Sequence, residues 1–207
     1  MFSALKEQPA DKILSLVQRF KEDTRSDKID LGVGVYKDAQ GLTPIMRSVK
    51  AAEKTLWENQ RTKSYVGLVG DVAFSDVMFH LLLDDAVQRD GVAAAATPGG
   101  TGAVRQAFEL VKLANARARI YVSDPTWPNH LSILNHMGLE MVPYRYFNSA
   151  TGGVSQSEML EDLSTARPGD VVLLHGCCHN PTGANMNISQ WQDVIDVLLK
   201  TGATPMI

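Results

Sequence analysis

Two patterns of apolar residues alternate along the chain from about residue 92 onward. Short continuous apolar runs predict buried strands, and apolar residues that recur every three or four positions predict helices with one apolar face. The predicted strands cover residues 92–96, 120–123, 141–147 and 171–174, and the predicted helices cover residues 103–114, 131–137, 157–166 and 189–200. This repeated order of strand and helix predicts an α/β fold, a mostly parallel sheet with helices on both faces.

The part of the chain before residue 92 carries mainly the helical pattern. The predicted helices here cover residues 11–21, 44–58 and 71–89, and Pro44 is well placed for the first turn of the second helix. Residues 31–36, which include Gly32 and Gly34, are expected to form a short extended segment. No internal repeat or low-complexity stretch interrupts these elements.

Charge and composition exclude several classes of protein. The 20 Lys and Arg residues are outnumbered by 23 Asp and Glu residues, which gives a net charge of −3, and no basic cluster indicates a nucleic-acid surface. No apolar run reaches the roughly 18–20 residues that span a bilayer, and the amino terminus lacks the apolar stretch of a secretory signal. The two cysteines are adjacent, a spacing that rarely forms a disulfide, so we expect a reduced, cytoplasmic protein.

A polar loop, His175-Gly176-Cys177-Cys178-His179-Asn180-Pro181-Thr182-Gly183, follows the predicted strand 171–174. Ligands of open α/β sheets bind at the carboxyl ends of strands, which makes this loop a candidate binding site. The alternative is that its Asn-Pro-Thr-Gly sequence provides only a turn. The histidines and cysteines suggest zinc at first, but adjacent cysteines do not match the usual spacing of zinc ligands, and we expect no metal.

A second polar segment, Thr97-Pro98-Gly99-Gly100-Thr101-Gly102, lies between a predicted strand and a predicted helix. Glycines let the backbone approach a ligand closely, and the amino terminus of a helix offers unpaired N–H groups, so this segment suits a phosphate. It is not a P-loop, because no Gly-Lys-Ser/Thr follows, and Arg105 stands where a dinucleotide-binding fingerprint has its third glycine. A nucleotide-dependent oxidoreductase is therefore not supported. The alternative is a plain glycine turn capped by Thr101.

A third segment, Ser123-Asp124-Pro125-Thr126-Trp127-Pro128-Asn129-His130, begins with the last residue of the predicted strand 120–123. Its two prolines fix the large flat ring of Trp127 at the end of a strand. From the residues alone, the alternative for Trp127 is burial in the core, and His130 would be a surface histidine at the start of a helix.

These three segments together resemble the cofactor-binding loops of class I aminotransferases that act on aspartate and aromatic amino acids and use pyridoxal 5'-phosphate (PLP). The segments occur in the family's order, and the resemblance extends from Asp11 to Ile207. It implies the large domain of a fold-type I PLP-dependent transferase, in incomplete form. It also implies that residues 1–43 form an amino-terminal arm and a piece of the small domain, and that residues 44–207 form the amino-terminal part of the PLP-binding large domain.

The resemblance implies roles for the residues around the cofactor ring. Trp127 stacks on the pyridine ring, and Asn180 donates a hydrogen bond to the phenolic oxygen of PLP. His130 and His175 are implied to lie beside the cofactor, where they support the residues that touch it. Trp127 and Asn180 also belong to the implied substrate-binding site.

Further roles are implied at the phosphate and at the substrate carboxylate. The Gly100 N–H and the Thr101 hydroxyl bind the phosphate, and Tyr65 reaches the cofactor phosphate of the partner subunit in a homodimer. The backbone at Gly34 faces the α-carboxylate of the substrate. Without the resemblance, Gly34 would belong to a closely packed strand and Tyr65 would be an ordinary half-buried tyrosine.

Members of this family are about twice as long as the chain. The resemblance implies that their second half carries the Schiff-base lysine, the aspartate that pairs with the pyridine nitrogen and the arginines that bind substrate carboxylates. None of the lysines in this sequence stands in a comparable context. The implied function is an aminotransferase that moves an amino group between an aspartate-like or aromatic amino acid and a 2-oxo acid. The alternative is a catalytically incompetent fragment that retains only folding, association and partial cofactor-binding surfaces.

Overall fold

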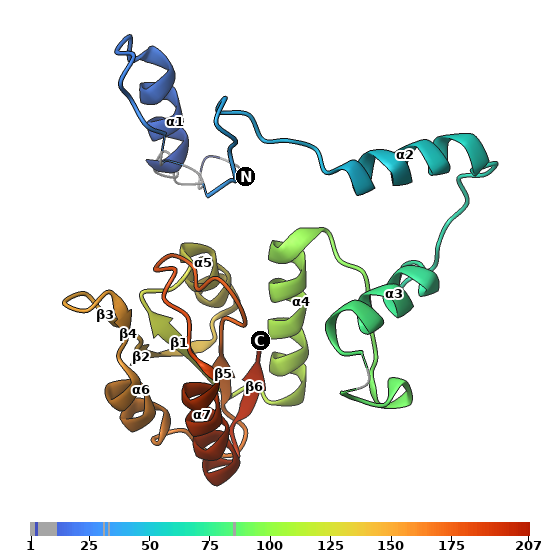
Figure 1. The fold of residues 1–207 in the computed structure, drawn as a ribbon. Coiled ribbons are helices and arrows are strands. Elements are labelled where there is room, and N and C mark those ends of the chain that lie inside the picture. Colours follow the sequence, from blue (N-terminus) through green and yellow to red (C-terminus); the bar gives the residue numbers. More distant parts are fainter. Residues whose placement is uncertain (1–2, 4–11, 31, 33, 85) are drawn as a thin grey trace. The chain divides into compact units, whose positions relative to one another are not determined.

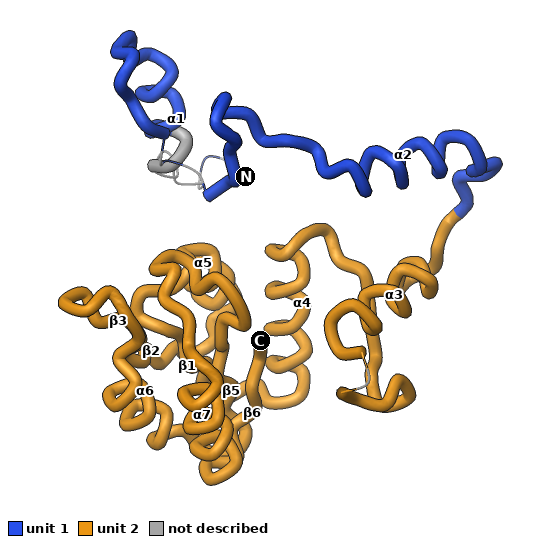
Figure 2. Tube along the Cα trace, viewed as in Figure 1, with its two compact units in different colours: residues 1–64 blue, residues 65–207 orange. Residues whose placement is uncertain are grey.

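The computed structural model describes residue 3 and residues 12–207 apart from 31, 33 and 85. The chain divides into two compact units, Met1–Ser64 and Tyr65–Ile207, which Figure 2 distinguishes by colour. All three candidate cofactor-binding segments belong to the second unit. No helix in the described part of the chain is long and apolar enough to cross a membrane.

The first unit begins with helix α1 (Lys12–Glu22) (Figure 1). This helix confirms the prediction over residues 11–21, whose first residue lies outside the described part of the chain. The Lys28 ammonium group donates hydrogen bonds to the carbonyl oxygens of Phe20 and Asp23, at 2.6 and 2.5 Å. These contacts satisfy carbonyl groups that have no helical partner at the end of α1.

The second helix, α2 (Arg47–Asn59), begins later than predicted. The expectation that Pro44 lies in its first turn is wrong, because Met46, directly before the helix, still has an extended backbone with ψ of 139°. The fixed φ of proline fits an extended chain as well as a helix, so Pro44 belongs to the approach to α2. Of the predicted extended segment, residues 31 and 33 lie outside the described residues, and residues 34–36 are not assigned to a strand.

The second unit is built on a four-stranded parallel sheet with the strand order β2-β1-β5-β6 (Figure 1). The strands are β1 (Arg119–Asp124), β2 (Glu140–Arg145), β5 (Val171–Leu173) and β6 (Thr204–Met206). The helices that alternate with them are α4 (Gly99–Ala114), α5 (Pro128–Met137), α6 (Gln156–Leu163) and α7 (Ile188–Thr201). This architecture confirms the predicted α/β fold with a parallel sheet.

Each face of the sheet has its own apolar core, because neighbouring residues of a strand point to opposite faces. On one face, Val172 belongs to a buried cluster with Val194 of α7. On the other face, Val171 belongs to a separate buried cluster with Phe108 of α4 and Leu134 of α5. Helices therefore cover both faces, as predicted, and burial of such side chains stabilises the fold by roughly 25 cal/mol per Å² of apolar surface.

The predicted strand 141–147 is divided into two strands. β2 ends at Arg145, and β3 (Phe147–Asn148) pairs antiparallel with β4 (Gly153–Val154). At the end of β2, the backbone N–H and the Nε of Arg145 both donate to the carboxylate of Asp162 in α6, at 2.8 and 2.9 Å. Asp162 thus provides a partner for the backbone N–H of Arg145 at the end of this edge strand.

The segment between α2 and α4 departs most from prediction. Helix α3 (Val72–Leu82) ends well before residue 89, because Asp84 has a left-handed backbone with φ of 43°, which a helix does not accommodate. A single turn of 3₁₀ helix, η2 (Arg89–Gly91), follows. The predicted strand 92–96 is wrong, since none of these residues is assigned to a strand. Four of the five are alanines, which lack the branched or aromatic side chains that pack on a pleated surface.

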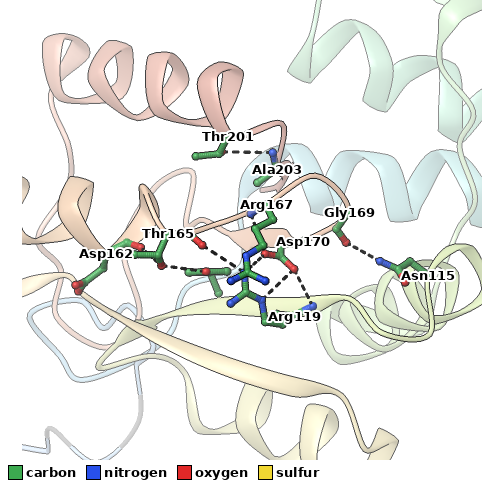
Figure 3. Close-up of polar contacts among 10 residues, drawn as sticks. Asn115, Arg119, Asp162, Thr165, Arg167, Gly169, Asp170, Thr201 and Ala203 are labelled. Atoms are coloured by element: carbon green, nitrogen blue, oxygen red, sulfur yellow. Dashed lines mark hydrogen bonds and ion pairs between the residues drawn. The ribbon is translucent and has the colours of Figure 1, made fainter.

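An ion pair joins the beginnings of β1 and β5 (Figure 3). The buried carboxylate of Asp170 accepts hydrogen bonds from Nε of Arg119 at 3.2 Å and from the N–H of Arg167 at 2.9 Å. Burial raises the pKa of Asp170, but the hydrogen bonds from Arg119 and Arg167 outweigh burial and lower the pKa below its ordinary value. These contacts fix the amino ends of the strands, and the polar segments follow the opposite ends.

Candidate functional site

A cavity of about 350 Å³ lies in the second unit, at the carboxyl ends of β1 and β5. β1 and β5 are parallel neighbours, so the segments that follow them meet at one edge of the sheet. The residues that line the cavity include Ala107 of α4, Trp127 and His130 after β1, and His175 and Asn180 after β5. The structure thus brings four of the predicted site residues together around a space of the size that small organic ligands occupy.

The glycine-rich segment forms the first turn of α4. This helix begins at Gly99, four residues before the predicted start at residue 103. The prediction relied on the spacing of apolar side chains, and glycines have none. Gly100 and Thr101 are exposed in this turn, where backbone N–H groups have no helical partner. The Thr101 hydroxyl accepts a hydrogen bond from the Asn129 amide at 3.0 Å, which joins α4 to the segment after β1. The first turn of α4 has the dipole and the open N–H groups that favour an anion.

Trp127 stands at the start of α5, as the residue before Pro128. Its indole is partly buried and lines the cavity, and it belongs to neither of the two buried core clusters. The His130 ring lies edge-on to the indole, with centroids 5.2 Å apart. His130 is only 7% exposed, so it is not the surface histidine that the sequence alone suggests.

A chain of hydrogen bonds connects His130 with the loop after β5. The N–H of Asn180 donates to Nδ1 of His175 at 3.1 Å, so a neutral His175 carries its proton on Nε2. Nε2 lies 3.3 Å from the Thr126 hydroxyl, which lies 2.9 Å from Nδ1 of His130. With His175 donating to Thr126 and Thr126 donating to His130, the proton of His130 is also on Nε2. The Asn180 N–H thereby fixes the tautomer of His175, and the direction of the Thr126 hydroxyl sets that of His130.

Burial keeps these imidazoles neutral. Burial, together with the nearby His175, lowers the pKa of His130 from its ordinary value to about 4. Burial also lowers the pKa of His175. A neutral imidazole can accept a hydrogen bond at Nδ1, whereas a protonated imidazole carries protons on both nitrogens and cannot. The chain of hydrogen bonds is therefore intact at neutral pH.

The loop after β5 presents different side chains to different surroundings. His175 and Asn180 line the cavity, whereas His179 is buried away from it, with 2% of its surface exposed. Cys177 and Cys178 are both exposed free thiols. Among the residues that the structure describes, no three or more His, Cys, Asp or Glu side chains are grouped in a way that could hold a metal ion.

Four of the predicted site residues do not line this cavity. Gly100 and Thr101 stand at the start of α4, the helix whose Ala103 does line it. Tyr65 belongs to the second unit but is fully exposed. Gly34 belongs to the first unit, where it is exposed and has open space on the side where a Cβ would stand. The roles suggested for these four residues stay predictions.

The sequence did not single out several residues that form the site. Thr126 connects the two cavity histidines through its hydroxyl, and Ser123 accepts or donates a hydrogen bond at 2.9 Å to Nε2 of His179. Both hydroxyls lie in the segment around Trp127, at the end of a predicted strand, which is the only signal that could have identified them. The apolar wall that Ala107 and Met206 provide has no local sequence signal, because it depends on how α4 and β6 pack.

Comparison with known proteins identifies close relatives. Residues 26–207 match the family model of class I and II aminotransferases. The chain is 55% identical over 207 residues to an aromatic-amino-acid aminotransferase of Paracoccus denitrificans, covering 100% of this chain and 52% of that protein. It is 44% identical over 209 residues to an aspartate aminotransferase of Haemophilus influenzae, covering 100% of this chain and 53% of that protein.

Solved structures agree with these relatives. An aromatic amino acid aminotransferase with 3-indolebutyric acid matches with a TM-score of 0.95 and 55% identity, over 99% of this chain and 52% of that one. An aromatic-amino-acid aminotransferase of Burkholderia pseudomallei, covalently bound to pyridoxal phosphate, matches with a TM-score of 0.93 and 37% identity, over 99% and 52% of the two chains. The chain therefore spans about half the length of the relatives that it matches, and it belongs to the class I and II aminotransferase family, where it represents the amino-terminal portion of the aromatic and aspartate type.

Proposed function

We propose that this chain provides the PLP-binding part of an aminotransferase that moves an amino group between an aspartate-like or aromatic amino acid and a 2-oxo acid. The observation that carries the proposal is the cavity at the carboxyl ends of β1 and β5, lined by Trp127, His130, His175 and Asn180. The family uses PLP, and the relatives named above act on aromatic amino acids or aspartate according to their names.

The first turn of α4 fits the phosphate of PLP. Gly100 has open space around its Cα, so the phosphate can approach its N–H without meeting a side chain. The Thr101 hydroxyl is held by Asn129 and stays exposed, so it can donate its proton to a phosphate oxygen. The positive end of the helix dipole favours the negative charge.

The side chains of Trp127 and Asn180 fit the ring of PLP. We propose that the indole stacks on the pyridine ring, since Trp127 lines the cavity and Pro128 restricts the backbone beside it. The Asn180 amide is exposed in the same cavity wall, where it can donate to the phenolic oxygen. Hydrogen bonds through Thr126 hold His130 and His175 in the same cavity wall, beside Trp127 and Asn180.

PLP, when bound, withdraws electrons from the substrate and so permits a proton to leave its Cα. We propose that the backbone at Gly34 receives the substrate α-carboxylate, and that Trp127 and Asn180 complete the substrate site. The resemblance to the family assigns the movement of this proton to a lysine. No lysine lines the cavity among the residues that the structure describes. We therefore propose that the 207 residues alone bind PLP weakly and do not transaminate.

We further propose a homodimer in the cytoplasm. Tyr65 is fully exposed, so its phenol is available to a neighbouring molecule, as a tyrosine that reaches a partner's phosphate must be. Cys177 and Cys178 are free thiols, which supports a reducing compartment. The assignment of residues 1–43 to an arm with a piece of the small domain, and of residues 44–207 to the large domain, belongs to the same proposal.

Incubation of the purified chain with PLP tests the proposed function. The mixture is divided: one part is assayed with aspartate or phenylalanine and a 2-oxo acid, and the other is reduced with borohydride and mapped for pyridoxyl-lysine by peptide mass. We expect reversible PLP binding, scattered substoichiometric labelling and no turnover. A single stoichiometric lysine adduct with turnover would contradict the proposed dependence on groups outside these residues. Absence of any PLP binding would contradict the cofactor-binding role itself.

A further inference from the structure

His179 is the one histidine of the loop after β5 that the proposed function leaves without a role. It is 2% exposed and does not line the cavity, whereas His175, four residues earlier, does. Between them, Cys178 has a left-handed backbone with φ of 56°, an uncommon conformation for a residue other than glycine. This turn of the chain allows the imidazoles of His175 and His179 to lie face to face, with centroids 4.2 Å apart.

Both nitrogens of His179 have hydrogen-bond partners. Nδ1 lies 2.9 Å from the Thr182 hydroxyl, and Nε2 lies 2.9 Å from the Ser123 hydroxyl. Thr182 comes from the same loop, and Ser123 comes from β1. His179 therefore connects the loop after β5 to the neighbouring strand β1.

The hydroxyl groups around His179 suit one tautomer. Thr182 accepts from the N–H of Ala184 at 3.2 Å, and its own proton is available to Nδ1 of His179. In that arrangement Nε2–H of His179 donates to the Ser123 oxygen.

A stack of three rings holds His179 in place. The ring of Tyr146 lies on one face at 3.9 Å with an angle of 11° between the planes, and the ring of His175 lies at 4.2 Å with an angle of 23°. The Tyr146 hydroxyl donates to the carbonyl oxygen of Ala184 at 2.7 Å, which secures the far side of the stack. His179 is thus the middle ring, and His175 rests on it.

The position of His175 determines the position of the cavity wall. Its Nδ1 accepts from the N–H of Asn180, and its Nε2 contacts Thr126. Movement of the His175 ring would break the contact that holds the backbone of Asn180. Support for His175 from His179 therefore extends to the residue proposed to bind the phenolic oxygen of PLP.

We infer that His179 is a positioning residue for the cofactor site: it acts through His175, holding that ring and the backbone of Asn180 in place, and touches neither cofactor nor substrate. The expected effect of His179 on PLP binding rests on the proposed function. The arrangement of the rings is a property of the chain itself and is testable without PLP.

Two variants separate the contributions of His179. His179→Phe keeps a flat ring between Tyr146 and His175 but removes both hydrogen bonds. His179→Gln keeps a donor for Ser123 but removes the face on which His175 rests. Leu163→Ala is the matched control, because Leu163 is fully buried in the same core cluster as Tyr146 but belongs to α6 and not to the loop after β5. The space that this substitution leaves in the core should lower the stability of the protein and leave the stacked rings of Tyr146, His179 and His175 in place.

The first measurement is the ¹⁵N spectrum of the imidazoles in the PLP-free chain. In the wild type we expect His175 and His179 both protonated at Nε2. In His179→Gln, the two nitrogens of His175 should move toward intermediate shifts as its ring loses a single orientation, whereas Leu163→Ala leaves them unchanged. Unchanged His175 shifts in a folded His179→Gln variant would overturn the inference, whatever the chain does with PLP.

The second measurement is the dissociation constant for PLP. We expect it to rise about fivefold to tenfold in both His179 variants, the loss that corresponds to one hydrogen bond, and to rise less in Leu163→Ala at an equal loss of Tm. If the dissociation constant for PLP rises equally in Leu163→Ala, His179 affects binding only through the general stability of the fold, and the inference is wrong. If the His179 variants do not fold, Ser123→Ala and Thr182→Val each remove one hydrogen bond and keep the ring, with the same expectations. Failure of the wild type to bind PLP would count against the proposed function and leave the spectra as the deciding result.

Discussion

Trp127 is held in the cavity wall by its neighbours in the sequence. It precedes Pro128, the first residue of α5, and His130 lies edge-on to its ring at 5.2 Å. Because the partly buried indole lines the cavity, a flat ligand in the cavity can stack on it. Stacking between aromatic rings contributes about 0.5–1.5 kcal/mol beyond the burial of area, and this makes Trp127 a direct test of the proposed site.

We expect Trp127→Ala to raise the dissociation constant for PLP about threefold to tenfold, which is the stacking contribution converted to affinity. Trp57→Ala is the control, since Trp57 is 82% exposed in α2. The measurement is a titration of each variant with PLP, followed by the absorbance of the cofactor. Equal affinities in all three proteins would assign Trp127 to the packing of the fold.

The buried imidazoles make stability depend on pH in a defined range. The pKa values of His130 and His179 are lowered to about 4, in both cases mainly by burial. Between about pH 4 and the ordinary histidine value near 6.5, the unfolded chain binds more protons than the folded chain. The free energy of unfolding therefore falls as the pH decreases through this range.

The test is urea unfolding at pH 7 and at pH 5. We expect a lower free energy of unfolding at pH 5, and a smaller difference between the two values in His130→Gln. The exposed His136 provides the control variant, His136→Gln, which should keep the wild-type difference. The lowered pKa of Asp170 affects a lower range, because its stabilising contribution is lost only as the pH falls below about 4. Identical stability at pH 7 and pH 5 would contradict neutral, buried imidazoles.

The sequence predicts the residues that carry distinctive chemistry but not those that connect them. Trp127, His175 and Asn180 stand out because they occupy polar segments directly after predicted strands. The role of Thr126 could not be predicted, because a hydroxyl contacts two histidines only once β1 and β5 lie side by side. Partners that come from distant parts of the chain leave no local pattern.

At the level of the elements, the joined beginnings of β1 and β5 determine where their carboxyl ends lie. Asp170 and Arg119 make this connection across two parallel strands (Figure 3). The carboxylate is buried, so removing its charge leaves the guanidinium without its partner.

Asp170→Asn should lower the free energy of unfolding by about 2 kcal/mol, the cost of disrupting a buried, charged hydrogen bond. The exposed Asp196 of α7 supplies the comparison variant, Asp196→Asn, for which we expect a change within about 0.5 kcal/mol. Thermal or urea unfolding measures both. A loss no larger in Asp170→Asn than in Asp196→Asn would show that the ion pair does not hold the strands.

The elements with strong apolar spacing were predictable, and those made of alanine and glycine were not. Helix α7 combines a clear apolar face with a capping box in which Asn187 and Gln190 exchange hydrogen bonds, and its predicted range is nearly that observed. Residues 92–96, where the predicted strand is absent, are mainly alanine. Helix α4 starts with glycines, which do not contribute to the spacing of apolar side chains. Both failures reflect residues whose side chains contribute little to packing.

For the whole molecule, a large apolar surface is open on the second unit. A groove of about 340 Å³ is lined by Trp191, Ile195 and Leu199 of α7 and by Pro205 and Ile207 at the end of the chain. Exposed apolar side chains occur on other elements as well, including Leu110 and Leu113 of α4. Contiguous apolar surface of this kind favours association.

We expect the purified chain to associate in a manner that depends on its concentration. Sedimentation velocity over a hundredfold range of concentration measures this, and a dimer is the species that the proposed role of Tyr65 requires. Monomer at every concentration would contradict the proposed homodimer. Assembly larger than a dimer would indicate that other apolar surfaces dominate.

Equilibrium dialysis of PLP against the purified chain tests the central claim, that the cavity at the carboxyl ends of β1 and β5 binds this cofactor. Pyridoxal, which lacks the phosphate, serves as the comparison ligand, and Trp127→Ala/Asn180→Ala serves as the comparison protein. We predict saturable binding of one PLP per chain, weaker binding of pyridoxal and strongly weakened PLP binding by the double variant. Binding that does not saturate, or that is the same for the wild type and the double variant, would contradict the account.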